Sequence, residues 1–353
     1  MSMRVLITGG CGFIGSSLAL ACRQAGWDVV CLDNLMRRGS EILLSRVQTA
    51  GAEFVHGDVR ILEDLDRVGK VDALVECSAE PSVLAGTQSG SARYVVETNL
   101  TGATNCFEFA RRRGCGVIFL STSRVYPHDY LNKGCYRETA ERIEYAGGLD
   151  GVSAAGVSTA CPLMGRRSLY GATKLAAELL LQEYADAFGV PAIINRCGLV
   201  SGPWQLGRSD QGVVAFWMAR HRFKQPLCYI GYGGTGKQVR DMLHIDDLCD
   251  LLLLQLGRLT RHRGEIYNAG GGAACSASLC ELTARCETLT GNHLAIAGEP
   301  RGRPADLAWF ITDNGTTEPT FGWCPRRGVD AVLADIYRWL QDNDALARGI
   351  FGA

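Results

Sequence analysis

The chain has 353 residues, 47 % of them apolar and 21 % charged, with a formal net charge of −1. This length exceeds one ordinary core and predicts two domains, or one domain with a substantial cap. The balanced charge argues against a nucleic-acid partner, and no apolar run is long enough to span a bilayer, which argues against a membrane protein.

Apolar stretches typical of buried strands alternate with helix-like segments from residue 4 to about residue 198. The expected strands are Arg4–Thr8, Asp28–Leu32, Glu53–His56, Ala73–Cys77, Val117–Ser121 and Ala192–Arg196. This alternation predicts an α/β fold with a doubly wound parallel sheet of the Rossmann type, covered by helices on both faces. We expect residues 1–198 to form this first domain.

The regular alternation is interrupted once and then fades. Segment 128–167 is polar and rich in glycine, so we expect a long insertion in the first domain that lies over a site. Residues 199–353 are punctuated by glycine and proline clusters and are expected to form mainly a smaller C-terminal substrate-binding domain. We expect residues 238–268 to return to the first domain.

The fifteen cysteines do not predict disulfides. Most lie inside apolar runs, where a thiol behaves as a small hydrophobic group. No C-x-x-C pair is present, and Cys275 and Cys280 have the wrong spacing for a zinc site, so no metal is expected. The opening apolar run is too short for a signal peptide, and we expect reduced thiols in a cytoplasmic protein.

A glycine-rich turn directly follows the first expected strand. Gly9, Gly12 and Gly15 recur at intervals of three and lead into an apolar helix that contains Phe13 and Ile14. The missing side chains allow a tight turn and let backbone N–H groups approach a pyrophosphate at the helix N-terminus. The context predicts a dinucleotide site, although a strand-to-helix turn without ligand is the alternative.

Asp33 ends the second expected strand, 18 residues beyond Gly15. A carboxylate there can accept hydrogen bonds from both adenosine ribose hydroxyls and would repel a 2′-phosphate, which favours NAD over NADP. Arg37 and Arg38 lie close behind and weaken that preference. Further residues expected around the cofactor are Asn34, Asp58, Val59, Ser78, Ala79 and Asn99. We expect Asp58 at the adenine, and a simple turn at the strand end is the alternative.

Tyr170 and Lys174 are four residues apart, which places both on one face of a helix. For Tyr170 to act as a base, the pKa of its phenol must fall from about 10 to near 7. This shift corresponds to a stabilisation of the phenolate by about 4 kcal/mol. The ammonium group of Lys174 and a positive nicotinamide ring are the available causes. Lys174 would also bind the nicotinamide ribose, and Thr122, after the fifth strand, is placed to hold the same substrate hydroxyl.

The order of glycine turn, S-T-x-x-V-Y from Ser121 and Y-x-x-x-K from Tyr170 resembles the extended short-chain dehydrogenase/reductase family over essentially the whole chain. The resemblance implies an NAD-dependent oxidoreductase mechanism on a nucleotide-diphosphate sugar. It also implies a structural role near the active site for Asn99 and a homodimer formed through two helices of the dinucleotide domain. Substrate-binding roles are implied for Arg240, Arg303 and Asp306.

The chain departs from two branches of that family. The family's 4,6-dehydratases carry Asp-Glu after the catalytic Thr, where this chain has Ser123 and Arg124, which argues against a dehydratase. Many 4-epimerases carry R-x-x-N after the sixth strand, whereas here Arg196 is followed by Cys197, Gly198 and Leu199. A 4-epimerase nevertheless stays open as an alternative.

Several segments resemble the branch of CDP-tyvelose (CDP-paratose) 2-epimerases. They are Phe54–Asp58, Asp210–Val213 and Gly236–Asp241, together with the long segment before Tyr170. The resemblance implies transient oxidation of the sugar, turning of the planar ketone and return of the hydride, with tightly bound and recycled NAD. Residues expected at the sugar are Glu80, Ser123, Arg124, Asp210, Gln211 and Gly212.

Other functions stay open at this point. A decarboxylase or a net reductase could use the same catalytic residues, and Glu80 leaves the exact sugar undecided because many relatives have Gln there. A non-catalytic NAD sensor is a remote alternative, since such proteins have typically lost the Tyr or the Lys.

Overall fold

The computed structural model describes residues 3–87, 90–207 and 211–352. Within these ranges the chain forms two compact units. The first contains Met1–Val125, Leu169–Arg196 and Cys249–Tyr267, and the second contains Tyr126–Ser168, Cys197–Leu248 and Asn268–Ala353. Across the described ranges, no helix combines the length and the apolar character that crossing a membrane requires.

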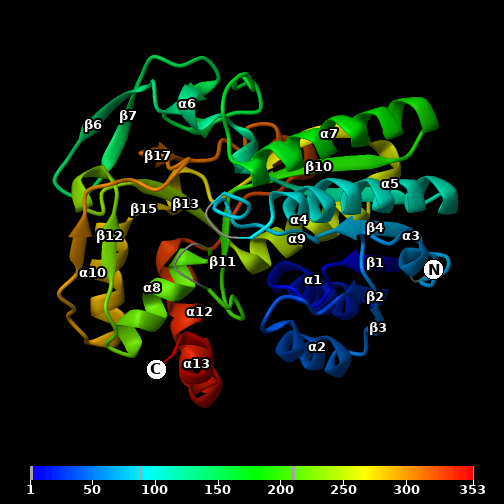
Figure 1. The fold of residues 1–353 in the computed structure, drawn as a ribbon, viewed down its shortest axis with the longest axis horizontal. Helices are drawn as coiled ribbons and strands as arrows, with labels where there is room; N and C mark the ends of the chain where they lie inside the picture. Colours follow the sequence, from blue (N-terminus) through cyan, green and yellow to red (C-terminus); the bar gives the residue numbers. More distant parts are fainter. Residues whose placement is uncertain (1–2, 88–89, 208–210, 353) are drawn as a thin grey trace. The chain divides into compact units, whose positions relative to one another are not determined.

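The first unit is built on a seven-stranded sheet with the order β14-β10-β5-β4-β1-β2-β3 (Figure 1). Its strands are β1 (Arg4–Thr8), β2 (Asp28–Asp33), β3 (Glu53–His56), β4 (Ala73–Glu76), β5 (Gly116–Thr122), β10 (Ala192–Cys197) and β14 (Arg263–Ala269). All pairings from β5 to β3 are parallel. The expected strands and the Rossmann-type α/β class are confirmed, and β14 is an additional strand that the sequence pattern did not predict.

Helices cover both faces of this sheet. They are α1 (Phe13–Gln24), α2 (Ser40–Thr49), α3 (Leu62–Asp66), α4 (Ala92–Val96), α5 (Gly102–Arg113), α7 (Leu169–Phe188) and α9 (Ile245–Leu256). Helices α5 and α7 lie side by side on one face, and α1 and α2 pack together near β2 (Figure 1). Because side chains alternate along a strand, Leu6 of β1 and Leu74 of β4 face α5, whereas Val5 and Ile7 face the opposite side.

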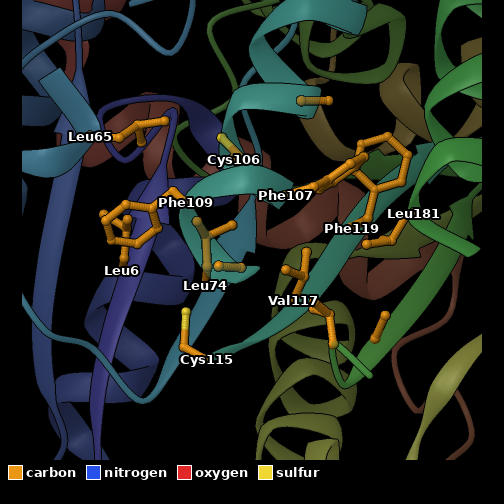
Figure 2. Packing of buried hydrophobic residues seen from close by; sticks show 14 of the residues in the cluster. Leu6, Leu65, Leu74, Cys106, Phe107, Phe109, Cys115, Val117, Phe119 and Leu181 are labelled. Carbon is orange, nitrogen blue, oxygen red and sulfur yellow. The ribbon is translucent and has the colours of Figure 1, made fainter. Parts of the chain in front are cut away.

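The core under α5 and α7 is dominated by aromatic and branched side chains (Figure 2). Phe107 of α5 is fully buried, and its ring meets that of Phe119 edge to face with 5.5 Å between centroids. Leu181 of α7 is buried in the same cluster. This packing fixes α7 against the sheet and therefore fixes the Tyr170–Lys174 turn at its N-terminal end.

The second unit has a small sheet in which β13 (Val239–His244) is central. It pairs in parallel with β11 (Leu199–Ser201) and β17 (Trp309–Phe310), and antiparallel with β15 (Ser276–Ser278). A separate two-stranded sheet pairs β12 (Cys228–Ile230) with β16 (Ala297–Glu299). The unit's helices are α6 (His128–Leu131), α8 (Val213–Arg222), α10 (Leu279–Thr290), α11 (Thr317–Phe321), α12 (Val329–Asp342) and α13 (Asp344–Phe351).

Segment 128–167 belongs to the second unit, whereas we expected it to be an insertion in the first domain. It contains two hairpins, β6–β7 (Cys135–Glu138, Ile143–Gly147) and β8–β9 (Val152–Ser153, Gly156–Val157). The segment is held in the second unit by its contacts with residues of that unit. The Ile143 N–H donates to the Lys237 carbonyl (2.8 Å), and the Tyr145 ring stacks on Trp309 with 5.3 Å between centroids. Of the expected return 238–268, the part Cys249–Tyr267 belongs to the first unit.

All fifteen cysteines lie in described segments and are free thiols. They are buried or half-buried, with the exception of Cys135 and Cys324, which are exposed. Burial raises the pKa of Cys11 and Cys22 to about 12, so these thiols are protonated and unreactive near neutral pH.

We predict that Phe107→Ala lowers the free energy of unfolding by about 3–5 kcal/mol, because it empties a fully enclosed site. Denaturant unfolding followed by circular dichroism measures this loss. Ile61→Ala is the control, since Ile61 is 48 % exposed in the same unit, and it should change stability by no more than about 0.5 kcal/mol. Equal losses in the two variants would contradict the core assignment.

Candidate active site

In the glycine turn between β1 and α1, backbone segments approach one another too closely for side chains to fit at several positions. Gly9 has φ +61°, and a Cβ atom at Gly15 would lie 2.2 Å from the Gly9 carbonyl oxygen. A Cβ at Gly10 would lie 2.5 Å from the Cβ of Cys31. Helix α1 begins at Phe13 directly after this turn, so its first N–H groups have no helical acceptor. The cradle fits a dinucleotide pyrophosphate.

Asp33 lies at the end of β2, beside the glycine turn. Its Oδ2 accepts the N–H of Cys11 (3.0 Å) and its Oδ1 accepts the N–H of Leu35 (2.8 Å). Burial raises the pKa of Asp33, and these two backbone hydrogen bonds oppose that rise. A carboxylate has about four acceptor positions, so the two bonds leave capacity for ribose hydroxyls.

Asp58 is the centre of a polar turn after β3. It accepts hydrogen bonds from the Arg60 guanidinium (2.6 and 2.9 Å) and from Asn34 Nδ2 (2.9 Å). Arg60 and Asn34 hold the pKa of Asp58 at about 2, so the carboxylate is charged and already partnered. Val59 packs against α5, where a Cβ at Gly102 would lie 2.7 Å from its Cγ2 atom. The role of Asp58 at an adenine stays a prediction.

Asn99 joins the loop after β4 to the start of α7. Its Oδ1 accepts the Glu80 N–H (2.7 Å), and its Nδ2 donates to the Glu80 carbonyl (3.0 Å) and to Thr173 Oγ1 (3.3 Å). Asn99 lies in a π-helical turn (Glu97–Thr101), a local widening that is frequent at functional sites. The half-buried Ser78 and Ala79 precede Glu80, and a Cβ at Gly9 would lie 3.0 Å from the Ser78 Cα.

Tyr170 and Lys174 occupy the first turns of α7, and both are buried. The loop after β5 holds this end of the helix, because a Cβ at Gly171 would lie 2.1 Å from the Arg124 carbonyl oxygen. Thr122, the last residue of β5, accepts the Arg124 N–H at Oγ1 (3.2 Å), and Ser123 between them is half-buried. The structure therefore ties the Thr122 strand end to the Tyr170 turn.

Lys174 has a buried partner that the sequence pattern did not identify. Its Nζ lies 3.1 Å from Glu76 Oε2 and 4.2 Å from the centroid of the Phe119 ring. Side-chain exposure is 2 % for Lys174 and 1 % for Glu76. The available signal was a single charged residue at the end of the otherwise apolar stretch Ala73–Glu76.

A second buried ion pair lies one helical turn further along α7. Glu178 accepts hydrogen bonds from Arg196 of β10 at 2.7 and 3.1 Å, and also from the hydroxyl of Ser121. This pairing accounts for Arg196, whose following residues depart from the R-x-x-N pattern. Removal of one partner from a buried ion pair typically costs about 3–5 kcal/mol, so the contact holds α7 firmly.

The second unit brings Arg240 and Asp306 into contact across 66 residues. Arg240 Nη2 lies 2.8 Å from Asp306 Oδ1 and donates to the Leu307 carbonyl (2.7 Å). Arg303 lies in the same turn, where its carbonyl accepts the Asp306 N–H (3.3 Å). Arg240 of β13 therefore contacts Asp306, and Arg303 lies in the turn that precedes Asp306.

The residues expected to line the sugar pocket are only partly described. Gly212 has φ +74° and directly precedes α8, and Gln211 is half-buried. A Cβ at Gly212 would lie 2.9 Å from the Gly207 Cα, which explains the glycine at this position. Asp210 lies outside the described residues, so its assignment stays a prediction.

Comparison with known proteins places these features in a family. Residues 5–270 match the model of the NAD dependent epimerase/dehydratase family. The chain belongs to that family. Its cofactor is NAD, in agreement with the glycine cradle and with Asp33.

Three relatives show how far the similarity extends within this epimerase/dehydratase family. The chain is 30 % identical to CDP-paratose 2-epimerase from Salmonella typhi, covering 96 % of this chain and 99 % of that protein. It is 28 % identical to UDP-glucose 4-epimerase from Erwinia amylovora, covering 97 % and 98 %. The solved structure of UDP-glucose 4-epimerase from Thermus thermophilus with NAD superposes with a TM-score of 0.76 at 26 % identity, covering 96 % and 99 %.

We predict that Gly171→Ala destabilises the protein by about 1–3 kcal/mol, because the new methyl group would overlap the Arg124 carbonyl and displace the start of α7. Thermal unfolding measures the change. Gly349→Ala is the matched control on helix α13, where a Cβ meets no atom within 4 Å, and its melting temperature should not fall. A Gly171→Ala protein as stable as the wild type would contradict the close contact.

Proposed function

We propose that the protein is an NAD-dependent nucleotide-sugar epimerase that inverts carbon 2 of a CDP-linked sugar of the paratose and tyvelose type. The observation that carries the proposal is the buried Tyr170–Lys174 turn of α7, held beside the Thr122 strand end. A phenol and an ammonium group one turn apart suit reversible removal of a hydroxyl proton. The choice of carbon 2 is supported by the similarity to CDP-paratose 2-epimerase.

In this proposal Tyr170 takes the proton of the sugar hydroxyl and later returns it. Thr122 donates a hydrogen bond to the same hydroxyl oxygen, which keeps it in line with the phenol. Bound NAD supplies reversible hydride transfer at the sugar carbon. The planar keto-sugar turns before reduction from its opposite face, so the protein must retain it throughout. We propose that NAD stays tightly bound and is recycled within each turnover.

The cofactor would be held by the glycine turn, by Asp33 at the adenosine ribose and by Lys174 at the nicotinamide ribose. The remaining residues that we assign to it are Phe13, Ile14, Asn34, Asp58, Val59, Ser78, Ala79 and Asn99. Asn99 would act by positioning, because its amide fixes the backbone of Glu80 and the side chain of Thr173.

Substrate contacts are proposed in two groups. Arg240, Arg303 and Asp306 would bind the diphosphate and the nucleotide ribose, since guanidinium groups pair well with phosphate oxygens. Residues proposed near the sugar are Glu80, Ser123, Arg124, Asp210, Gln211 and Gly212. We also propose a cytoplasmic location, because reduced thiols such as the fifteen here persist in that compartment.

A nucleotide-sugar 4-epimerase is the second candidate. It is supported by 28 % identity to a UDP-glucose 4-epimerase over nearly the full chain, and it would use the same Tyr170 chemistry. The two candidates differ in the nucleotide of the substrate and in which sugar carbon faces the phenol. A test of function must therefore report the position of inversion as well as turnover.

The first test is proton NMR in D2O of the purified protein with CDP-paratose or CDP-glucose and no added cofactor. We expect inversion at carbon 2 with retention of the C–H hydrogen, because the hydride returns within the same enzyme molecule. Tyr170→Phe should lower the rate by about 10²–10⁴-fold. Inversion of UDP-hexoses at carbon 4 instead would support the second candidate and reject the first.

A matched control separates loss of the base from general damage to α7. Tyr184 lies on the same helix, and its hydroxyl meets Glu108 at 3.4 Å. Tyr184→Phe should keep the wild-type rate. If Tyr170→Phe keeps it as well, Tyr170 is not the base.

We also propose a homodimer through α5 and α7. In support, Leu179 and Phe188 of α7 are each 58 % exposed, and Leu180 is 38 % exposed. We predict that Leu179→Glu converts a dimer into a monomer in sedimentation velocity, because the introduced carboxylate would have to be buried in the dimer interface. Leu254→Glu on α9, where Leu254 is 36 % exposed, should leave the dimer intact. A wild-type monomer would reject the proposal.

A further inference from the structure

Glu76 is a buried acid at the centre of the sheet in the first unit. It is the last residue of β4, which lies between β1 and β5, and it pairs in register with Thr8 and Phe119. Its Oε2 meets Lys174, whereas its Oε1 has no hydrogen-bond partner among the described residues. Burying an acid in this environment costs free energy unless a partner compensates its charge.

The surroundings of Glu76 contain few other charges. The titratable groups that act on it, or that it acts on, in the described part of the chain are Lys174 on α7 and the buried thiol of Cys106 on α5. Burial raises the pKa of Glu76, and the Lys174 ammonium and the Ser78 N–H oppose that rise. The pKa of Cys106 lies well above its usual value, so this thiol adds no charge near neutral pH. The dominant charge contact of Glu76 is therefore Lys174.

We propose that Glu76 is a positioning residue for Lys174, which holds the ammonium group against the Phe119 ring and offsets its charge at Tyr170. This inference rests on the proposed roles of Tyr170 and Lys174. An ammonium group has three N–H donors, and Glu76 takes one of them, so Lys174 keeps donors for a ribose hydroxyl. Glu76 touches neither substrate nor cofactor in this proposal and acts only through Lys174.

The charge of the pair determines the direction of the effect. With Glu76 ionised, Lys174 and Glu76 together carry no net charge, so Tyr170 experiences only a dipole. With glutamine at position 76, the ammonium carries an uncompensated positive charge one helical turn from the phenol. A positive charge favours the phenolate, so Tyr170 should lose its proton at a lower pH.

The test is a tyrosinate titration by ultraviolet difference absorbance on the full-length protein as purified. The signal of Tyr170 is the titration of each protein minus that of its Tyr170→Phe counterpart. We expect the midpoint of Tyr170 in Glu76→Gln to lie about one pH unit below that of the wild type. The acid limb of the rate profile should move in the same direction. An unchanged or higher midpoint would overturn the proposal.

Glu178→Gln is the matched control, because it also removes the charge of a buried, ion-paired glutamate, in this case one on α7 whose partners are Arg196 and Ser121. It should move the midpoint of Tyr170 much less than Glu76→Gln does. Equal shifts would mean that any lost buried charge has this effect, and would reject a specific role for Glu76. If Glu76→Gln does not fold, Glu76→Asp keeps the charge but withdraws it from Nζ, and a smaller downward shift is expected.

The titration also separates this inference from the proposed function. It needs no substrate, so a lowered midpoint in a protein that fails to invert nucleotide sugars would support the role of Glu76 and reject the epimerase. Inversion at the expected rate with an unmoved midpoint would support the epimerase and reject the role of Glu76.

Discussion

Helix α7 is fixed by two buried ion pairs of opposite polarity, and the rest of the site depends on this constraint. Lys174 meets Glu76 of β4, and one turn later Glu178 meets Arg196 of β10. Rotation of α7 about its axis would separate these partners and leave an uncompensated buried charge, which typically costs about 3–5 kcal/mol. Tyr170 lies one turn before Lys174 and is therefore held at a defined position. Under the proposed function, this fixed position suits proton transfer between Tyr170 and a bound hydroxyl.

The carboxyl edge of the sheet in the first unit also carries several buried polar residues. Parallel strands end at one edge, so Thr8, Glu76 and Thr122 follow one another there at the ends of β1, β4 and β5. The glycine turn follows β1 at this edge, and a Cβ at Gly15 would lie only 2.2 Å from the Gly9 carbonyl oxygen. Ligands of open α/β sheets bind outside these carboxyl ends, which agrees with the membership in the NAD dependent epimerase/dehydratase family.

The sequence predicted the parts that depend on local pattern. The six apolar strands, the glycine turn and the Tyr170–Lys174 spacing can each be recognised within one short stretch of the sequence. Strand β14 was missed because Arg263–Ala269 contains a glycine and three polar residues and lacks a continuous apolar pattern. The unit to which segment 128–167 belongs could not be predicted from local pattern. Its short hairpins are stabilised by residues such as Lys237 and Trp309, which are far away in sequence. The Glu76–Lys174 contact joins residues 98 positions apart, so no local sequence pattern predicts it.

The two ion pairs that we connect with ligands differ in a way that follows from burial. Lys174 and Glu76 are 2 % and 1 % exposed, whereas Arg240 and Asp306 are 20 % and 19 % exposed. Water screens the second pair and can replace either partner, so opening it costs far less than opening the first. Under the proposed function this difference matches the ligands. A substrate diphosphate must exchange in every turnover, and it would meet Arg240, whose ion pair opens easily. A retained cofactor would meet Lys174, whose buried ion pair stays closed.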